Sequence, residues 1–309
     1  MKLPSHGLIT GVVAVLTVIA LTGCSGTPNS TGSPATSTGR FAVDSHTLVF
    51  GVVPDSAATQ TNYQPLMDYL AKVTGKKVTY QQSTDYAALI EAAVAGKIDV
   101  ASFSGFTYVT AKKNGAAITP ISSIITKQGQ EPGYYSEAIV PANSTITDIS
   151  GFKNKKVCFV SPTSTSGYLF PSYSLLNAGI DPAQEVTPVF AGKHDVSVAK
   201  VAAGGECDAG FAEDSEADPA AAAGKIRIIA KTMVPGAPIT ISDTLPQATK
   251  DSVIKALSTV TIDQIIAAGI TSANTDGFKS VFHATSPVTD NYYDTVRDIC
   301  KKTNAKQCQ

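Results

Sequence analysis

The chain of 309 residues lacks tryptophan, has few charged side chains and shows no excess of charge of either sign. Charged residues make up 16% of the sequence, and the formal net charge is −1. Because nucleic-acid binding needs a basic surface, this balance argues against a nucleic-acid partner. No Cys-x-x-Cys spacing and no histidine beside a cysteine occurs, so the sequence predicts neither a metal site nor a cofactor.

Long hydrophobic runs are also missing after the first residues. The run Leu8 to Leu21 would rise about 21 Å as a helix, which is short of the roughly 30 Å core of a bilayer. We therefore expect residues 1–23 to be a signal peptide. The segment Leu21-Thr22-Gly23-Cys24 resembles the bacterial lipobox. This resemblance implies that Cys24 is lipidated and anchors the chain to the outer face of the cell membrane; an ordinary secretory signal with a chance cysteine is the alternative.

Residues 24–45 are rich in Ser, Thr, Gly and Pro and contain almost no large apolar side chains. Such a segment cannot bury enough surface to offset its ordering entropy. We expect a flexible lipidated tether, whose coil would span roughly 25 Å; a mucin-like stalk is the alternative.

The rest of the chain is long enough for two lobes with separate cores. Its first part alternates short apolar runs with helical spacing, where Gly75 would end the first helix and Thr84 would begin the second. The expected strands are 48–53, 78–80 and 98–103, and the expected helices cover 63–70, 86–94 and 105–113. This order is typical of a parallel sheet with crossover helices.

Two extended stretches, 118–125 and 134–140, follow before the pattern restarts. The second unit has expected strands at 156–160, 186–190, 207–211 and 226–230, with helices at 166–178 and 194–203. An extended segment, 239–242, and two amphipathic helices near 246–268 and 287–302 complete the chain. We predict an α/β protein with lobe 1 formed by 46–138 plus 240–309 and lobe 2 by 139–239. Ligands of such sheets bind beyond the carboxyl ends of the strands, here between the lobes.

Four cysteines remain in the exported part of the chain, and four cysteines allow three pairings. Cys300 and Cys308 flank a short C-terminal segment that a bridge would hold in place. Cys158 and Cys207 lie in expected strands of the same lobe. We therefore expect the bridges Cys158–Cys207 and Cys300–Cys308.

The strongest local motif is a run of hydroxyl side chains, Ser164, Thr165 and Ser166, followed by Gly167. It comes directly after an expected strand and opens an expected helix. Free N–H groups and the positive dipole end at a helix start bind oxyanions without a cation. A capping role for one serine is the alternative, although a cap needs only one hydroxyl.

The segment Ser164-Thr-Ser-Gly-Tyr-Leu-Phe-Pro171 resembles the phosphonate-binding periplasmic protein family, which also contains phosphite binders. Further pieces of the chain are similar to the family in the same order: 48–54, 63–70, Asp85-Tyr86, 96–101, 192–195, 201–204 and 207–210. The resemblance covers roughly residues 47–250. It implies a type II, Venus-flytrap fold with hinge strands, and a monomeric substrate-binding protein, not an enzyme, that hands a small phosphorus oxyanion to an ABC permease and its ATPase.

The family also implies roles for single residues. Ser164, Thr165 and Ser166 would hold the phosphonyl oxygens, and His194 would complete the cradle from its own helix start, because an imidazole N–H can donate at any pH. Two roles are open for each of the remaining candidates. Tyr86 could donate a hydrogen bond to the ligand across the cleft or pack in the core, and Ser104 could donate to the ligand or cap a helix. Glu213 and Asp214 could bind an amine of the ligand or lie on the surface of the hinge.

The chain departs from the family's aminoalkylphosphonate binders. An acid expected between two prolines is absent from Pro235-Gly-Ala-Pro238, and Phe103 stands where a tyrosine is common. A small ligand such as phosphite, methylphosphonate or phosphate is therefore favoured.

Three alternatives to this reading are open. A serine hydrolase or phosphatase would lack the Gly-x-Ser-x-Gly motif and a group to orient the histidine. A binder of sulfonates or amino acids would be expected to use an arginine, but Arg227 and Arg297 alone follow Phe41 and neither lies at an expected cleft edge. A surface sensor that signals to a partner protein would share every feature described so far.

Overall fold

The computed structural model describes residues 45–309. The predicted signal peptide, nearly all of the tether and the lipidation site Cys24 lie outside the described residues. Among the helices that the structure describes, none combines the length and the apolar character needed to cross a bilayer.

Eleven strands of the described chain form one sheet in the order β2-β1-β3-β10-β4-β5-β8-β6-β7, with β11 added to β4 and β9 to β5. The strands are β1 (Thr47–Val52), β2 (Lys77–Gln81), β3 (Val100–Ser102), β4 (Ile118–Ile125), β5 (Gly133–Pro141), β6 (Lys156–Phe159), β7 (Thr187–Phe190), β8 (Ala209–Glu213), β9 (Ile226–Pro235), β10 (Pro238–Ser242) and β11 (Ala284–Ser286). β1 is parallel to β2 and β3, and β6 is parallel to β7 and β8, as the two α/β patterns predicted.

The helices follow the strands in chain order. They are α1 (Thr59–Thr74), α2 (Tyr86–Val94), α3 (Gly105–Lys113), α4 (Phe170–Asn177), α5 (His194–Ala203), α6 (Asp214–Ala222), α7 (Gln247–Leu257), α8 (Ile262–Ala267), α9 (Asp276–Val281) and α10 (Asp294–Thr303). One π-helical turn, η2 (Thr165–Leu169), precedes α4, and short 3-10 turns occur at Ile149–Phe152 (η1), Thr271–Asn274 (η3), Asp290–Tyr293 (η4) and Lys306–Cys308 (η5).

Most expected boundaries agree with the structure. Gly75 ends α1 with a φ of 64°, a left-handed conformation that glycine adopts without strain. The cap of α2 was predicted wrongly, because Asp85 and not Thr84 accepts the N–H of Ala88, at 2.8 Å. An ionised carboxylate next to a helix start is a stronger acceptor than a hydroxyl and also faces the positive end of the dipole.

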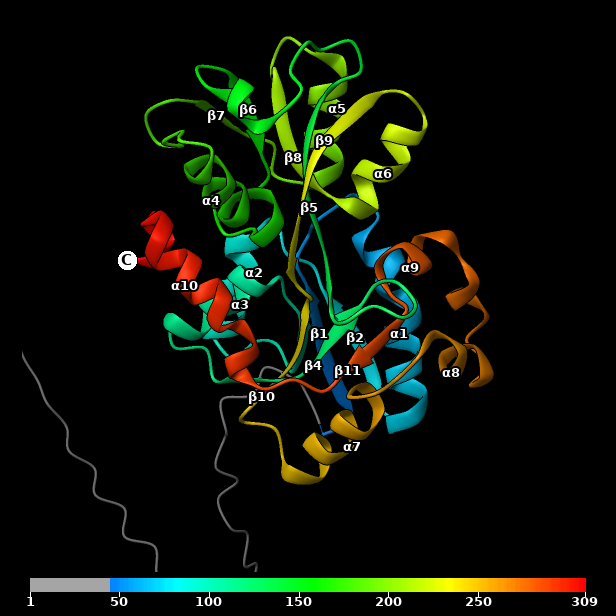
Figure 1. Cartoon of the computed structure of the whole chain (residues 1–309). Helices are drawn as coiled ribbons and strands as arrows, with labels where there is room; N and C mark the ends of the chain where they lie inside the picture. Colours follow the sequence, from blue (N-terminus) through cyan, green and yellow to red (C-terminus); the bar gives the residue numbers. More distant parts are fainter. Residues whose placement is uncertain (1–44) are drawn as a thin grey trace, which may run out of the picture. The chain divides into compact units, whose positions relative to one another are not determined.

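Two long strands connect two halves of the sheet. β5 and β9 pair antiparallel from Gly133↔Pro235 to Pro141↔Ile226, while β4 touches β5 only at Ile125↔Gly133. Figure 1 shows β5 and β9 running side by side from the part with β1–β4 to the part with β6–β8. The chain therefore has the two-lobed α/β architecture with hinge strands. The residue boundaries given above for the lobes stay a prediction.

Both cysteine pairs are bridged in the structure, with Cα–Cα distances of 5.6 Å for Cys158–Cys207 and 5.5 Å for Cys300–Cys308. The strand expected at 207–211 is β8, which starts two residues later, so Cys207 precedes the strand instead of lying in it. The bridge thus joins β6 to the segment that enters β8.

The C-terminal region differs from the expectation of two long helices. It contains α7, α8, α9 and α10 with β11 between the last two. A capping box at Thr261 and Gln264 starts α8 and separates it from α7. The apolar face of α10 (Val296, Ile299 and Cys300) belongs to one buried cluster with Phe106 of α3 and Phe170 of α4. This helix therefore contacts elements of both predicted lobes.

Hydrogen bonds also join the two lobes directly. They run from Phe106 N to Thr165 Oγ1 (2.7 Å), from Thr107 Oγ1 to the Thr163 carbonyl (3.0 Å) and from His194 N to the Asp55 carbonyl (2.8 Å). The structure therefore has the lobes in contact at the helix starts of α3 and α5.

Candidate functional site

A cavity lies between the lobes, and both contribute to its wall. The space in it that is open to the centre of a water molecule is about 50 Å³, enough for a few waters or one small ion. Its polar lining comprises Asp55, Tyr63, Tyr86, Ser104, Thr126, Tyr134, His194, Glu213, Asp214, Ser215 and Ser280. None of the described residues that line it is a lysine or an arginine. An anion bound there would have to be held by neutral donors.

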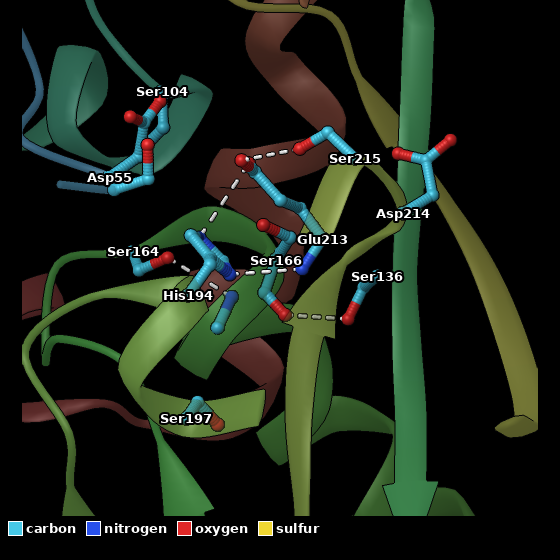
Figure 2. A network of polar contacts seen from close by, with 12 residues as sticks. Asp55, Ser104, Ser136, Ser164, Ser166, His194, Ser197, Glu213, Asp214 and Ser215 are labelled. Carbon is cyan, nitrogen blue, oxygen red and sulfur yellow. Dashed lines mark hydrogen bonds and ion pairs between the residues drawn. The ribbon is translucent and has the colours of Figure 1, made fainter. Parts of the chain in front are cut away.

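Several helices begin at this cavity. Tyr86 is the first residue of α2 and His194 the first of α5, while Ser104 and Glu213 are the N-caps of α3 and α6. Figure 2 shows Asp55 and Ser104 on one side and His194 and Glu213 on the other. The positive dipole ends of these helices therefore converge on the cavity and favour negative charge within it.

The structure fixes the protonation pattern of His194. Its side chain is 2% exposed, and Nδ1 accepts the backbone N–H of Glu213 at 2.9 Å. The proton of the neutral ring is therefore on Nε2, which lies 3.7 Å from Glu213 Oε2. Burial lowers the pKa of His194 to about 4, although nearby acids, Asp55 first, oppose this shift. At neutral pH the ring is an uncharged Nε2–H donor.

Glu213 ends β8 and faces the same space. Its Oε1 accepts the hydroxyl of Ser215 at 2.8 Å. Burial raises the pKa of Glu213 to about 8; the charges of Glu216 and Asp214 add to this rise, and the Ser215 hydrogen bond opposes it. At neutral pH this carboxyl is largely protonated, so it can donate as well as accept.

Asp55, in the loop after β1, was missed in the sequence. Thr59 Oγ1 donates to Asp55 Oδ1, and the Asp55 carbonyl accepts the N–H of His194. Burial raises the pKa of Asp55 to about 7, with a further contribution from the charge of Glu213 across the cleft. Nothing in the local sequence marks this residue, because only the approach of the lobes places it opposite Glu213.

The hydroxyl run does not itself line the cavity. Ser164 caps η2, where its Oγ accepts the N–H of Gly167 at 3.0 Å, and Thr165 Oγ1 accepts the N–H of Phe106 from the other lobe. Both hydroxyls therefore have a structural acceptor role. Each keeps its own hydrogen for another partner.

Ser166 differs from its two neighbours. It is fully buried, and within residues 45–309 the phenol of Tyr134 is the one side chain that its hydroxyl approaches closely enough for a hydrogen bond. Over the same residues, the backbone N–H groups of Thr165 and Ser166 donate to no partner, as expected for the first positions of a helix. The Ser166 carbonyl is fixed by Ser136 Oγ at 2.6 Å. The turn therefore holds two unused backbone donors and one hydroxyl next to a cavity tyrosine, all of them in buried residues.

Two cavity tyrosines connect the turn to the cavity. Burial raises the pKa values of Tyr86 and Tyr134, and the hydrogen bonds of Tyr86 with Ser164 and of Tyr134 with Ser166 oppose the rise. The phenols are therefore neutral donors at physiological pH. Of the residues predicted from the sequence, the structure brings Tyr86, Ser104, His194 and Glu213 to the cavity wall and the hydroxyl run to a position behind it. Asp214, considered together with Glu213 in the sequence, also lines the cavity, whereas Tyr63, Tyr134 and Asp55 were missed.

Asp214 lines the cavity too, but its charge is balanced on the hinge side. Its Oδ2 lies 2.9 Å from Lys127 Nζ, and its Oδ1 accepts the N–H of Tyr135 at 3.3 Å. An ion pair of this kind leaves Asp214 little capacity for a ligand amine. It also ties α6 to the loop between β4 and β5.

The carboxyl groups predict a pH dependence of stability. Asp55 and Glu213 bind protons more tightly in the folded chain than in the unfolded one, so their contribution to stability falls as pH rises toward 7 and 8. The lowered pKa of His194 acts in the opposite direction only below about 6.5. We expect the melting temperature to fall between pH 6.5 and 8, and to fall less in a variant with Asp55→Asn and Glu213→Gln. Equal slopes in calorimetric melts of the two proteins would contradict this assignment.

Comparisons with known proteins agree on one family. A sequence model for periplasmic substrate-binding proteins of phosphonate ABC transporters matches residues 50–285. The protein of Mycolicibacterium smegmatis named phosphate-import protein PhnD is 33% identical, over 100% of both chains. The phosphonates-binding periplasmic protein of Escherichia coli is 26% identical over 67% of this chain and 64% of its own. The solved structure of PhnD1 from Prochlorococcus marinus in complex with methylphosphonate superimposes with a TM-score of 0.70 at 20% identity, covering 84% of this chain and 99% of that one.

Proposed function

The chain belongs to the family of periplasmic substrate-binding proteins of phosphonate ABC transporters, and from this premise we propose that it binds one small phosphorus oxyanion in the cavity between its lobes. At the level of the family, the protein is the extracytoplasmic binding component of a phosphonate or phosphate importer, and its partners are a small ligand and an ABC permease with its ATPase. The identity of the ligand and the residues that hold it are our proposal.

The observation that carries the proposal is the set of donors at Thr165 and Ser166. Two buried N–H groups without an acceptor are unfavourable unless a ligand satisfies them. These N–H groups and the Ser166 hydroxyl lie at the positive end of η2 and α4, where a tetrahedral anion is favoured. We place the phosphonyl oxygens against this turn, with His194 Nε2–H as a further donor.

The ligand reaches the turn past Tyr86 and Tyr134. Both phenols line the cavity, and both lie next to hydroxyls of the turn. When a ligand enters, each phenol can replace its hydrogen bond with the serine by a hydrogen bond to a ligand oxygen and still line the cavity wall. The hydroxyl run would then be part of the site although it lies behind the wall.

The size of the cavity favours a ligand without a long substituent. Ala237 lines the wall with a methyl group, in the Pro235–Pro238 segment that lacks an acid. A side chain at Gly236 would meet Ile124 O and Ser123 Oγ at 2.5 Å, so this position cannot supply an acid either. Phosphate, phosphite or methylphosphonate therefore fits better than 2-aminoethylphosphonate, in agreement with the names of the mycobacterial and Prochlorococcus proteins.

The mode of attachment is part of the proposal. A lipid on Cys24 and a tether over residues 24–45 would keep a monomeric binding protein near its permease. A hydrolase gains no support: within the described residues His194 makes no hydrogen bond to a serine or threonine hydroxyl, and the family consists of transport proteins. The sulfonate-binding proteins with a similar structure are 14–16% identical and show only the fold.

Calorimetric titration of the chain without its first 44 residues against phosphate, phosphite, methylphosphonate and 2-aminoethylphosphonate tests the proposal. We expect Ser166→Ala to weaken the tightest of them by roughly 10- to 150-fold, since a hydrogen bond to a charged group contributes about 1.5–3 kcal/mol. The same variant should stay folded and lose no more than about 1.5 kcal/mol of its free energy of unfolding, the contribution of one neutral hydrogen bond, here that with Tyr134. Ser252→Ala, on the exposed face of α7, is the control. Undiminished binding by Ser166→Ala would remove the turn from the site.

A further inference from the structure

The cavity contains two carboxyl groups that face each other, one from each lobe. Asp55 comes from the loop after β1, and Glu213 from the end of β8. Figure 2 shows the two side chains on opposite sides of the site, with His194 below them. A pair of acids is unusual for a site that takes an anion, because a carboxylate and an oxyanion repel each other.

One oxygen of each acid is already used by the protein. Asp55 Oδ1 accepts the hydroxyl of Thr59, which also accepts the N–H of Ser56 at 3.0 Å. Glu213 Oε1 accepts the hydroxyl of Ser215. Within residues 45–309, Glu213 Oε2 has only the distant His194 Nε2 at 3.7 Å, and Asp55 Oδ2 has no side-chain donor, although the N–H of Ser56 lies near the Asp55 carboxyl. These two acceptors remain for a ligand.

No cation compensates the pair within the described lining of the cavity. Lys127, whose partner Asp214 lines the cavity, is paired with Asp214 and Asp218 at 2.9 and 3.6 Å. His194 is a neutral ring, so it offers one hydrogen and no charge. Each contact between a carboxyl oxygen and a ligand oxygen therefore needs one hydrogen between the two atoms.

That hydrogen has two sources, the ligand's own hydroxyl or the protonated carboxyl. Glu213, with its pKa raised to about 8, holds a hydrogen of its own at neutral pH, whereas Asp55, with its pKa raised to about 7, is in part a carboxylate there and then needs the hydrogen of the ligand. Phosphate at neutral pH carries one or two hydroxyl hydrogens, whereas sulfate has nearly the same size and shape and carries none. A buried acceptor left without its hydrogen disfavours the wrong ligand.

We propose that Asp55, with Glu213 opposite it, is a specificity-determining residue that selects hydroxyl-bearing oxyanions such as phosphate and rejects sulfate. This inference rests on the proposed function, since it concerns the same cavity. In this role the acids accept hydrogen bonds from the ligand's hydroxyl groups and do not bind an amine. The loop before α1, which no motif distinguishes, thereby controls which tetrahedral anion enters the importer.

The test compares phosphate, sulfate and methylphosphonate by isothermal titration at pH 7, for the wild type and for Asp55→Asn. Asparagine has the shape of aspartate, but its amide can donate to an oxygen that carries no hydrogen. We expect the wild type to bind phosphate at least about 100-fold more tightly than sulfate. In the variant this ratio should fall at least about tenfold, chiefly because sulfate binds more tightly. Asp251→Asn, on the exposed face of α7, should leave the ratio unchanged.

The outcomes separate the two proposals. If the wild type binds phosphate and sulfate equally well, or if Asp55→Asn and Glu213→Gln both keep the wild-type ratio, the inference is wrong while the proposed function stands. Tighter binding of 2-aminoethylphosphonate than of phosphate also contradicts it, because the acids then hold an ammonium group. If the wild type binds none of these phosphorus compounds, the proposed function itself is wrong. Glu213→Gln provides the second variant should Asp55→Asn fail to fold.

Discussion

A Gly167→Ala variant is expected to lose about 1–3 kcal/mol of its free energy of unfolding and to bind phosphate at least about tenfold more weakly. A Cβ at residue 167 would lie 2.4 Å from Val160 Cβ and 2.9 Å from Ser164 Oγ. No rotamer change of Val160 relieves a contact with its Cβ, and its backbone is held by Gly167 O at 3.0 Å and by the N–H of Gly192 at 2.8 Å. The turn must therefore move away from β6 as a whole.

Movement of this turn would displace the donors of Ser166 together with the cap that Ser164 provides. Denaturant unfolding and titration with phosphate measure the two effects separately. Gly151→Ala is a control in the same lobe, since its Cβ would meet one methyl group, Ile146 Cγ2, at 2.8 Å, whereas the Ile146 Cβ lies 3.5 Å away. A Gly167→Ala protein with wild-type affinity would show that the close approach of this turn to β6 does not matter for binding.

Two substitutions of His194 should distinguish the roles of its two ring nitrogen atoms, Nδ1 and Nε2. Asparagine can accept the N–H of Glu213 with its side-chain oxygen, as Nδ1 does at 2.9 Å, but cannot reach the position of Nε2. We expect His194→Asn to keep most of the stability and to weaken binding roughly 10- to 150-fold, the effect of one hydrogen bond to a charged group. His194→Gln places an amide N–H near Nε2 and should recover part of the affinity.

His194→Ala should lower both the stability and the ligand affinity. It leaves the buried N–H of Glu213 without an acceptor, which costs about 1–3 kcal/mol of the free energy of unfolding. His283→Ala is the control, since this histidine does not line the cavity. Equal affinities of the asparagine, glutamine and wild-type proteins would show that His194 only supports the backbone at Glu213.

The fold followed closely from hydrophobic periodicity. The parallel strands β1–β3 and β6–β8 and the helices α3 and α5 were predicted within two residues, because each has an apolar or amphipathic pattern and is bounded by glycine or polar residues. The helix α6 was missed because Asp214-Ser-Glu-Ala-Asp-Pro-Ala-Ala-Ala222 contains a proline and no apolar repeat. Alanine has high helix propensity but gives no periodic signal, and tertiary packing decides such a segment.

The site was predictable only where the sequence itself concentrates donors. Ser164, Thr165 and Ser166 are adjacent, and a helix start next to a strand end is readable in a sequence. Asp55 and Glu213 are 158 positions apart, and only the folded chain brings them to one cavity. Their pKa values depend on burial by both lobes, so no pattern within one segment could have marked them.

The direct bonds between the lobes bear on how fast a captured molecule escapes. Phe106 N, Thr107 Oγ1 and His194 N each bond to the opposite lobe rather than to cargo. The dwell time of the cargo is therefore set partly by protein–protein bonds, which must break before it leaves. A membrane partner that pulls the helix starts of α3 and α5 apart would accelerate unloading without touching the cargo. Solution off-rates would then understate the speed of delivery.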